Sequence, residues 1–130
     1  MKALEHPDVP FKLWSIGEEQ EVPSDTIRKE ASNNSCFQGI ASDCAVVLSF
    51  LSSLESEIMG DPRRYCHLHW HAGLLGQMLY VEAHQLGLGA TGMGCFLDDE
   101  SSAAFQQPQF VPLYHFALGH QAPDHRFQAV

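Results

Sequence analysis

Residues 63–87 read RRYCHLHWHAGLLGQMLYVEAHQLG, and this stretch decides the fold. Apolar side chains recur along it four residues apart, in two rows: Trp70, Leu74, Met78 and Leu75, Leu79, Ala83. The combined stripe is broader than a surface helix normally shows, and no proline interrupts it. A glycine at position 87 suits a left-handed C-terminal cap. The sequence therefore predicts one long, mostly buried helix over residues 63–87.

Two glycines lie inside this predicted helix, Gly73 and Gly76. Each costs roughly 1 kcal/mol of helix propensity relative to alanine. A helix accepts that cost most easily where another backbone must approach closely. Tight packing in the core explains the same glycines without any functional meaning, and both interpretations stay open.

The rest of the chain predicts short elements around the helix. Residues 1–34 are weakly patterned, whereas the chain is richer in apolar residues from Cys36 onwards. The predicted elements are strands at 45–51 and 111–119, and helices at 26–31, at 52–59 and from Asp98. A helix from Asp43 competes with the first of these strands. We expect a weakly patterned segment at 1–34 followed by one α+β unit at 35–130.

Composition limits the classes of partner. The chain has 130 residues, 45% of them apolar, so it is long enough for one domain with a buried core. Seven Lys plus Arg against sixteen Asp plus Glu give a net charge of −9. This acidity argues against nucleic acid or an anionic membrane as the main partner. No apolar run is long enough to predict a membrane span.

The cysteine pattern predicts free thiols. The four cysteines, Cys36, Cys44, Cys66 and Cys95, match no zinc-binding spacing. Residues 1–15 lack the cationic start and apolar core of a secretory signal. We therefore expect a cytoplasmic protein whose thiols are reduced.

Three histidines, His67, His69 and His71, raise the question of a metal site. On a strand all three would share one face, but on the predicted helix only His67 and His71 are one turn apart. A third ligand would have to come from His84, His115, His120 or a carboxylate, and nothing in the sequence fixes which. Ordinary surface histidines are therefore favoured over a metal centre. The sequence also contains no G-x-S-x-G nucleophile motif.

The segment 87–96 is rich in glycine, with four glycines in eight residues. It predicts a loop or an irregular strand whose backbone can approach a ligand. A dinucleotide-binding fingerprint would follow a strand and open a helix, whereas this segment follows a helix. It also lacks the Gly-Lys-Ser/Thr of a P-loop.

A family resemblance is carried by a series of patterns that covers roughly residues 13–127. The densest are YxxLHWxAGLxGQxLYxEA at 65–83 and ATGxGCFxDD at 90–99, with supporting patterns SCxQxIAxD at 35–43, LYHFxLG at 113–119 and PDxR at 123–126. Together they resemble the C-terminal half of nitroreductase-like flavoproteins. The closest branch is the SagB-type or thiazole/oxazole dehydrogenase-like one.

The resemblance implies an α+β nitroreductase-like fold, present in part, with FMN bound at a homodimer interface that includes the long helix. Such enzymes pass a hydride from NAD(P)H through the flavin to a nitroaromatic, quinone, azoline or similar small acceptor, and the cofactor carries the chemistry. No catalytic side chain is implied. The resemblance places the backbone of Thr91, Gly92, Met93 and Gly94 against the isoalloxazine, with the Gly94 amide facing flavin N5. Arg126 matches an arginine at the FMN phosphate.

The sequence departs from this family in its first part. The arginine-rich phosphate-binding motif of the family, resembling R-R-S-x-R, has no counterpart here. His67 and His71 stand where an arginine or aromatic residue and a glutamate are expected. We therefore expect weak FMN binding, or none, unless a partner chain completes the site. The alternative is a truncated, flavin-free interaction module that keeps the dimer core.

Overall fold

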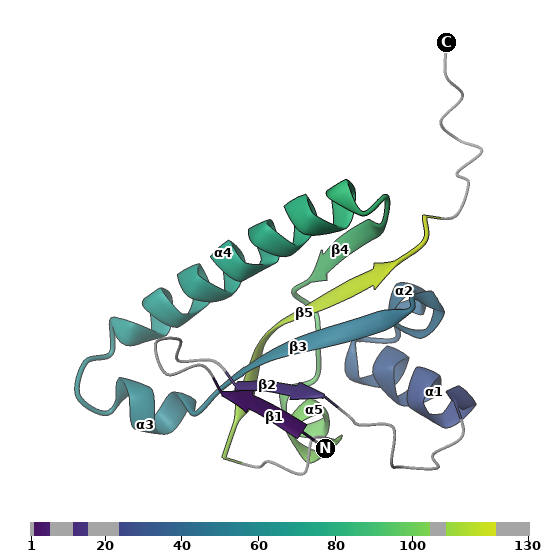
Figure 1. The fold of residues 1–130 in the computed structure, drawn as a ribbon. Coiled ribbons are helices and arrows are strands. Elements are labelled where there is room, and N and C mark those ends of the chain that lie inside the picture. Colours follow the sequence, from purple (N-terminus) through teal and green to yellow (C-terminus); the bar gives the residue numbers. More distant parts are fainter. Residues whose placement is uncertain (1, 6–11, 16–23, 105–108, 122–130) are drawn as a thin grey trace.

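The computed structural model describes residues 2–5, 12–15, 24–104 and 109–121 (Figure 1). Its elements are, in chain order, β1 (Lys2–Glu5), β2 (Lys12–Ser15), α1 (Ser24–Asn34), α2 (Gly39–Asp43), β3 (Val46–Ser52), α3 (Leu54–Ile58), α4 (Arg64–Gln85), β4 (Gly89–Met93), α5 (Asp98–Ala104) and β5 (Val111–Gly119). The predicted α+β class is confirmed. No helix within the described ranges is both long and apolar enough to cross a bilayer.

The strands form two antiparallel sheets. β1 pairs with β2, and the larger sheet has the order β3-β5-β4. Its central strand, β5, pairs Leu118 with Val46 on one side and Ala117 with Thr91 on the other. The register shifts once, between Phe50 and Leu51 of β3. The predicted strand at 45–51 is thus confirmed over the competing helix.

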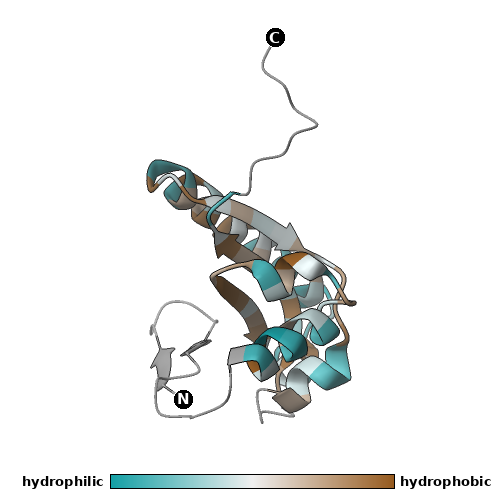
Figure 2. Ribbon diagram, turned by 90° about the vertical axis from the view of Figure 1, so that its right-hand side faces the viewer, coloured by the Kyte–Doolittle hydropathy of each residue, from teal (hydrophilic) through white to brown (hydrophobic). Residues whose placement is uncertain are grey.

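Helices lie on both sides of this sheet, with α4 on one side and α1 and α2 on the other (Figure 1). Alternate side chains of β5 serve the two layers, as the period of two in a strand requires. Phe116 joins Leu68 and Ala72 of α4 in one apolar cluster. Ala117 joins Ala41 of α2 in the other. Figure 2 shows hydrophobic residues along the strands of this sheet and many hydrophilic residues on α1 and α2.

The long helix is confirmed, but the prediction that it is mostly buried is wrong for this chain alone. Its buried residues form one face against the sheet: Leu68, Ala72, Gly76 and Ala83. On the opposite side Trp70 is 65% exposed, and Leu74 and Met78 are each 64% exposed. The sequence period locates the apolar residues, but it does not say that only some of them meet the sheet. Gly87, with φ +70°, ends the helix as predicted.

The two helix glycines have different surroundings. A Cβ added to Gly76 would lie 3.0 Å from Cε1 of Tyr114 on β5, so this glycine lets the helix pack closely on its own sheet. A Cβ on Gly73 would meet nothing within 4 Å. Core packing therefore explains Gly76, and Gly73 lies at the exposed surface.

Candidate functional site

The residues predicted to meet a flavin lie on and just after β4. This strand is at the edge of the larger sheet, because β5 is the only described strand that pairs with it. Thr91, Gly92 and Met93 lie within the strand, and Gly94 follows it directly. The glycine-rich segment is thus a regular strand for five residues and irregular beyond them. An edge strand keeps half of its backbone groups free of sheet pairing, which leaves them available to other partners.

Gly92 is committed to packing inside the chain. Its amide donates a hydrogen bond to the hydroxyl oxygen of Tyr80 on α4, with an N–O distance of 2.6 Å. A Cβ at this position would overlap the phenol oxygen of Tyr114. Tyr80 therefore occupies the amide of Gly92, and Tyr114 fills the space that a side chain would take there. Neither is open to a ligand.

Met93 contributes its side chain to the core. It is 2% exposed and packs with Ala41 and Ala117 between the sheet and α2. Thr91 is half-buried and lines a hollow of about 560 Å³ near the end of β5. Gly94 is exposed, and a Cβ there would meet no atom of the described residues within 4 Å. Of the four predicted residues, Thr91 and Gly94 are therefore the accessible ones.

These residues fit a flavin ring better than they fit its phosphate. A flat ring needs an open stretch of backbone, and Gly94 offers one. A phosphate needs free cations, but Arg63 is paired with Asp61 at 2.9 Å and Arg64 with Glu57 at 3.2 Å. The Arg28 guanidinium donates to the carbonyl oxygens of Ser42 and Cys44. Arg126 lies outside the described residues, so its predicted role stays a prediction.

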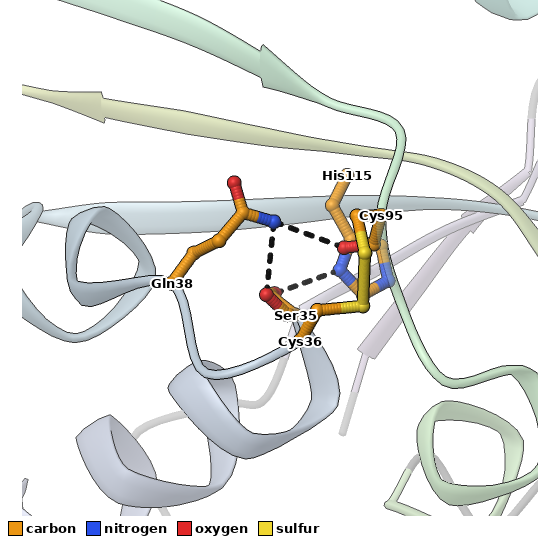
Figure 3. Close-up of a disulfide and its surroundings, with 5 residues drawn as sticks. All are labelled: Ser35, Cys36, Gln38, Cys95 and His115. Carbon is orange, nitrogen blue, oxygen red and sulfur yellow. Dashed lines mark hydrogen bonds between the residues drawn. A yellow bond between two sulfur atoms is a disulfide. The ribbon is translucent and has the colours of Figure 1, made fainter.

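A disulfide next to this segment corrects the prediction of four free thiols. Cys36 and Cys95 are bonded, with their Cα atoms 5.8 Å apart, whereas Cys44 and Cys66 are free. Sequence spacing gave no signal for the pair, because 59 positions separate the two cysteines. They meet because the turn after α1 reaches the segment that follows β4. The Gln38 amide nitrogen donates to the carbonyl oxygen of Cys95 in the same place, at 3.1 Å (Figure 3).

A buried histidine lies beside the disulfide (Figure 3). His115 is 2% exposed, and its Nδ1 shares a 3.1 Å hydrogen bond with Ser35 Oγ. The Phe96 ring stacks on the imidazole with a centroid distance of 4.8 Å. Desolvation lowers the pKa of His115 to about 4, so the ring is neutral at pH 7. Among the described residues, none supplies a hydrogen-bond partner for its Nε2. Sequence reasoning had considered His115 only as one possible metal ligand.

The surface histidines of α4 do not assemble a centre. His67 and His71 are both exposed, and the His67 ring packs near Trp70 with a centroid distance of 5.2 Å. His69 Nδ1 lies 3.0 Å from the carbonyl oxygen of Tyr65. Within the part of the chain that the structure describes, no group of three or more His, Cys, Asp or Glu is placed to hold a metal ion.

Comparison with known proteins gives a family model and several solved structures. The model of the nitroreductase family matches residues 12–120. A structure from Anabaena variabilis, described as a nitroreductase, is 36% identical with a TM-score of 0.70, and the match covers 74% of this chain and 20% of that one. A nitroreductase from B. subtilis is 19% identical with a TM-score of 0.62, and the match covers 78% of this chain and 48% of that one. A protein from Staphylococcus epidermidis, described as an NAD(P)H:FMN oxidoreductase, is 15% identical with a TM-score of 0.63. That match covers 93% of this chain and 70% of that one. No curated protein sequence matches the chain.

The matched structures differ from this chain in length. The chain spans 20% of the Anabaena variabilis protein and 48% of the B. subtilis protein. The two matches below 25% identity show the shared fold. The family model matches most of the chain, residues 12–120.

Proposed function

The chain belongs to the nitroreductase family, and from this membership we propose that it is a flavin-dependent oxidoreductase chain that uses FMN. Bound FMN would supply the hydride chemistry, taking a hydride from NAD(P)H and passing it to a nitroaromatic, quinone, azoline or similar small acceptor. The observation that carries the proposal is the open backbone at Gly94, directly after the edge strand β4. The protein of Staphylococcus epidermidis described as an NAD(P)H:FMN oxidoreductase supports the choice of cofactor and donor.

The residues of this chain would hold the flavin rather than react with it. The Gly94 backbone and Thr91 would contact the ring, and Arg126 would contact the phosphate. Gly92 and Met93 would fix the strand from its two faces, Gly92 by packing against Tyr114 and Met93 by packing against Ala41 and Ala117. We also assign the chain to the SagB-type or thiazole/oxazole dehydrogenase-like branch, and to the C-terminal half of that fold, on the patterns at 65–83 and 90–99. We place it in the cytoplasm.

A partner chain is part of this proposal. Trp70, Leu74 and Met78 form an exposed apolar face on α4, which we call the outer face of α4. A contiguous apolar surface of this kind marks an interaction site more often than an accident of composition. We propose that a second copy of this chain, or a complementing chain, covers it. Such a partner would also supply further cations for the phosphate, because Arg28, Arg63 and Arg64 are already engaged within the chain.

FMN titration tests the cofactor. Flavin fluorescence is followed while the protein is added, for the wild type and for Gly94→Val. We expect wild-type binding and at least a tenfold loss for Gly94→Val, because its side chain would fill the space that the ring needs. Gly60→Ala is the matched control, since a Cβ there also meets nothing within 4 Å but lies far along the chain from β4. Equal binding by all three proteins would contradict the placement at Gly94.

A second function is favoured by the paired arginines. Arg63 and Arg64 are held by carboxylates, so a flavin-free module that retains only the outer face of α4 is the alternative. Sedimentation of Met78→Glu against the wild type tests that face, and we expect the charged variant to be monomeric where the wild type self-associates. A stable wild-type dimer that takes up no FMN at any concentration would favour the alternative.

A further inference from the structure

The Cys36–Cys95 disulfide is placed where another molecule can reach it. As a residue Cys95 is exposed and Cys36 is half-buried, so the bond joins two residues at the surface and not in the core. A disulfide is broken by the attack of a thiolate on one sulfur, and access to that sulfur is a first requirement. Because Cys95 is the more exposed residue of the two, we expect an incoming thiolate to attack its sulfur.

Two hydrogen bonds hold the same two segments together without the disulfide. The Leu97 amide donates to the carbonyl oxygen of Asn34 at 2.8 Å. The Gln38 side chain donates to the carbonyl oxygen of Cys95 at 3.1 Å (Figure 3). These two bonds alone would hold the segments less firmly than they do together with the disulfide, yet they would keep the two thiols close enough for the disulfide to re-form.

The backbone on the Cys36 side is in an uncommon conformation. Cys36 has φ +54° and Phe37 has φ +60°, and two successive residues other than glycine rarely adopt this left-handed region. Such residues cost free energy and persist only where the surroundings hold them. The disulfide is one of the contacts that hold this turn, beside backbone hydrogen bonds such as that from the Phe37 amide to the carbonyl oxygen of Ser32. We therefore expect the turn to become more mobile when the disulfide opens.

Both cysteines also border a contact to His115. Ser35, which precedes Cys36, hydrogen-bonds Nδ1, and Phe96, which follows Cys95, stacks on the ring. The disulfide thus ties together the two segments whose residues Ser35 and Phe96 contact the buried imidazole. On its other side Cys95 directly follows Gly94.

We propose that Cys36–Cys95 is a thiol–disulfide exchange site for an external dithiol protein, and that reduction loosens residues 94–97 from the turn after α1. In the first step a thiolate of the dithiol attacks Cys95 Sγ, a mixed disulfide forms, and Cys36 leaves as a thiolate. In the second step the other thiol of the reductant attacks the mixed disulfide and releases Cys95. Two electrons pass to this chain, the two protons of the dithiol end on Cys36 and Cys95, and the reductant becomes a disulfide.

The consequence for the cofactor rests on the proposed function. The loosened segment begins at Gly94, the residue assigned to the flavin ring. Reduction would then weaken FMN binding, so that a chain meeting a reducing partner would lose its cofactor more readily.

Native-state reduction by thioredoxin tests the exchange step. The folded chain is incubated with reduced thioredoxin, alkylated and weighed by mass spectrometry, while circular dichroism follows its helix content. We expect two additional alkyl groups, at Cys36 and Cys95, with the helical signal unchanged. A thioredoxin variant that lacks its second cysteine should be trapped on Cys95. Cys66→Ser is the matched control and should behave like the wild type, because Cys66 is exposed and free.

Other outcomes would overturn the proposal. A bond that thioredoxin opens only in denaturant would show a structural disulfide, and four free thiols after oxidation by glutathione disulfide would show that no pair forms. Hydrogen exchange of the Leu97 amide tests the loosening. We expect it to be at least tenfold faster in the reduced chain, and an unchanged rate would contradict that part.

FMN titration of the two redox states then separates this proposal from the proposed function. Weaker binding in the reduced state supports both, and equal binding in both states overturns the consequence for the cofactor. No binding in either state overturns the proposed function, while the mass and exchange results still decide the exchange site.

Discussion

Replacing Gly92 by alanine should destabilise the chain, although it adds a single methyl group. The new Cβ would overlap the phenol oxygen of Tyr114 and would lie 3.1 Å from its Cε1. The ring also lies closely over Gly76 of α4, where even a Cβ would approach its Cε1 to 3.0 Å, so the helix limits how far it can shift on that side. It is also flanked by Phe50, with a centroid distance of 5.9 Å. Either the strand or the tyrosine must move.

The magnitude follows from the cost of overpacking a filled core, about 1–3 kcal/mol. For a chain of 130 residues, each kcal/mol lowers Tm by roughly 4 °C. We therefore expect Tm of Gly92→Ala to fall by about 4–12 °C in thermal unfolding followed by circular dichroism. Gly94→Ala is the control, since its added Cβ would meet no described atom within 4 Å and its Tm should lie close to that of the wild type.

A double-mutant cycle identifies the cause. In a Tyr114→Leu background the overlapping phenol is absent, so Gly92→Ala should cost at least 1 kcal/mol less than it does in the wild type. If Gly92→Ala and Gly94→Ala lose the same stability, or if the two substitutions at 92 and 114 are additive, the packing argument is wrong.

Three further predictions concern stability. His115 binds its proton near pH 4 when folded and near its ordinary value of 6.5 when unfolded, so the unfolded state binds more protons between these values. The free energy of unfolding should therefore fall as the pH drops from 6.5 to 4, by roughly 3 kcal/mol in all, and urea titrations should show this fall in the wild type and not in His115→Gln. Tyr80→Phe leaves the Gly92 amide without its partner and should cost about 1 kcal/mol in urea unfolding, whereas no loss would show that water replaces the hydroxyl. Cys36→Ser opens a loop of 59 positions and should lower the free energy of unfolding by about 4 kcal/mol, while Cys66→Ser should leave it unchanged.

The sequence predicted the elements better than their environments. Helix α4 is long and strongly periodic, so its existence followed from the spacing of its apolar residues. Its exposure did not follow, because Leu74 and Leu75 are the same residue type and only one of them faces the sheet. That choice depends on how the helix is rotated against β5, which is a tertiary property.

The sequence could not distinguish the surroundings of the predicted site residues, for a similar reason. A resemblance in sequence located the segment 91–94, but it treated four neighbouring residues alike. In the structure these residues have different surroundings. The Met93 side chain is buried, the Gly92 amide is hydrogen-bonded to a tyrosine, and Gly94 is open. The Cys36–Cys95 bond was missed because its partners meet only after two distant segments have packed.

The order of strands in the larger sheet has a consequence for synthesis on the ribosome. The central strand, β5, is the last of the three in the chain, although both of the others depend on it. Neither β3 nor β4 can pair until residues 111–119 have left the exit tunnel. Until then both strands present unpaired edges and apolar side chains, and such contacts between distant residues form slowly. A pause in translation just before this strand would therefore prolong the interval in which the nascent chain is most prone to aggregate.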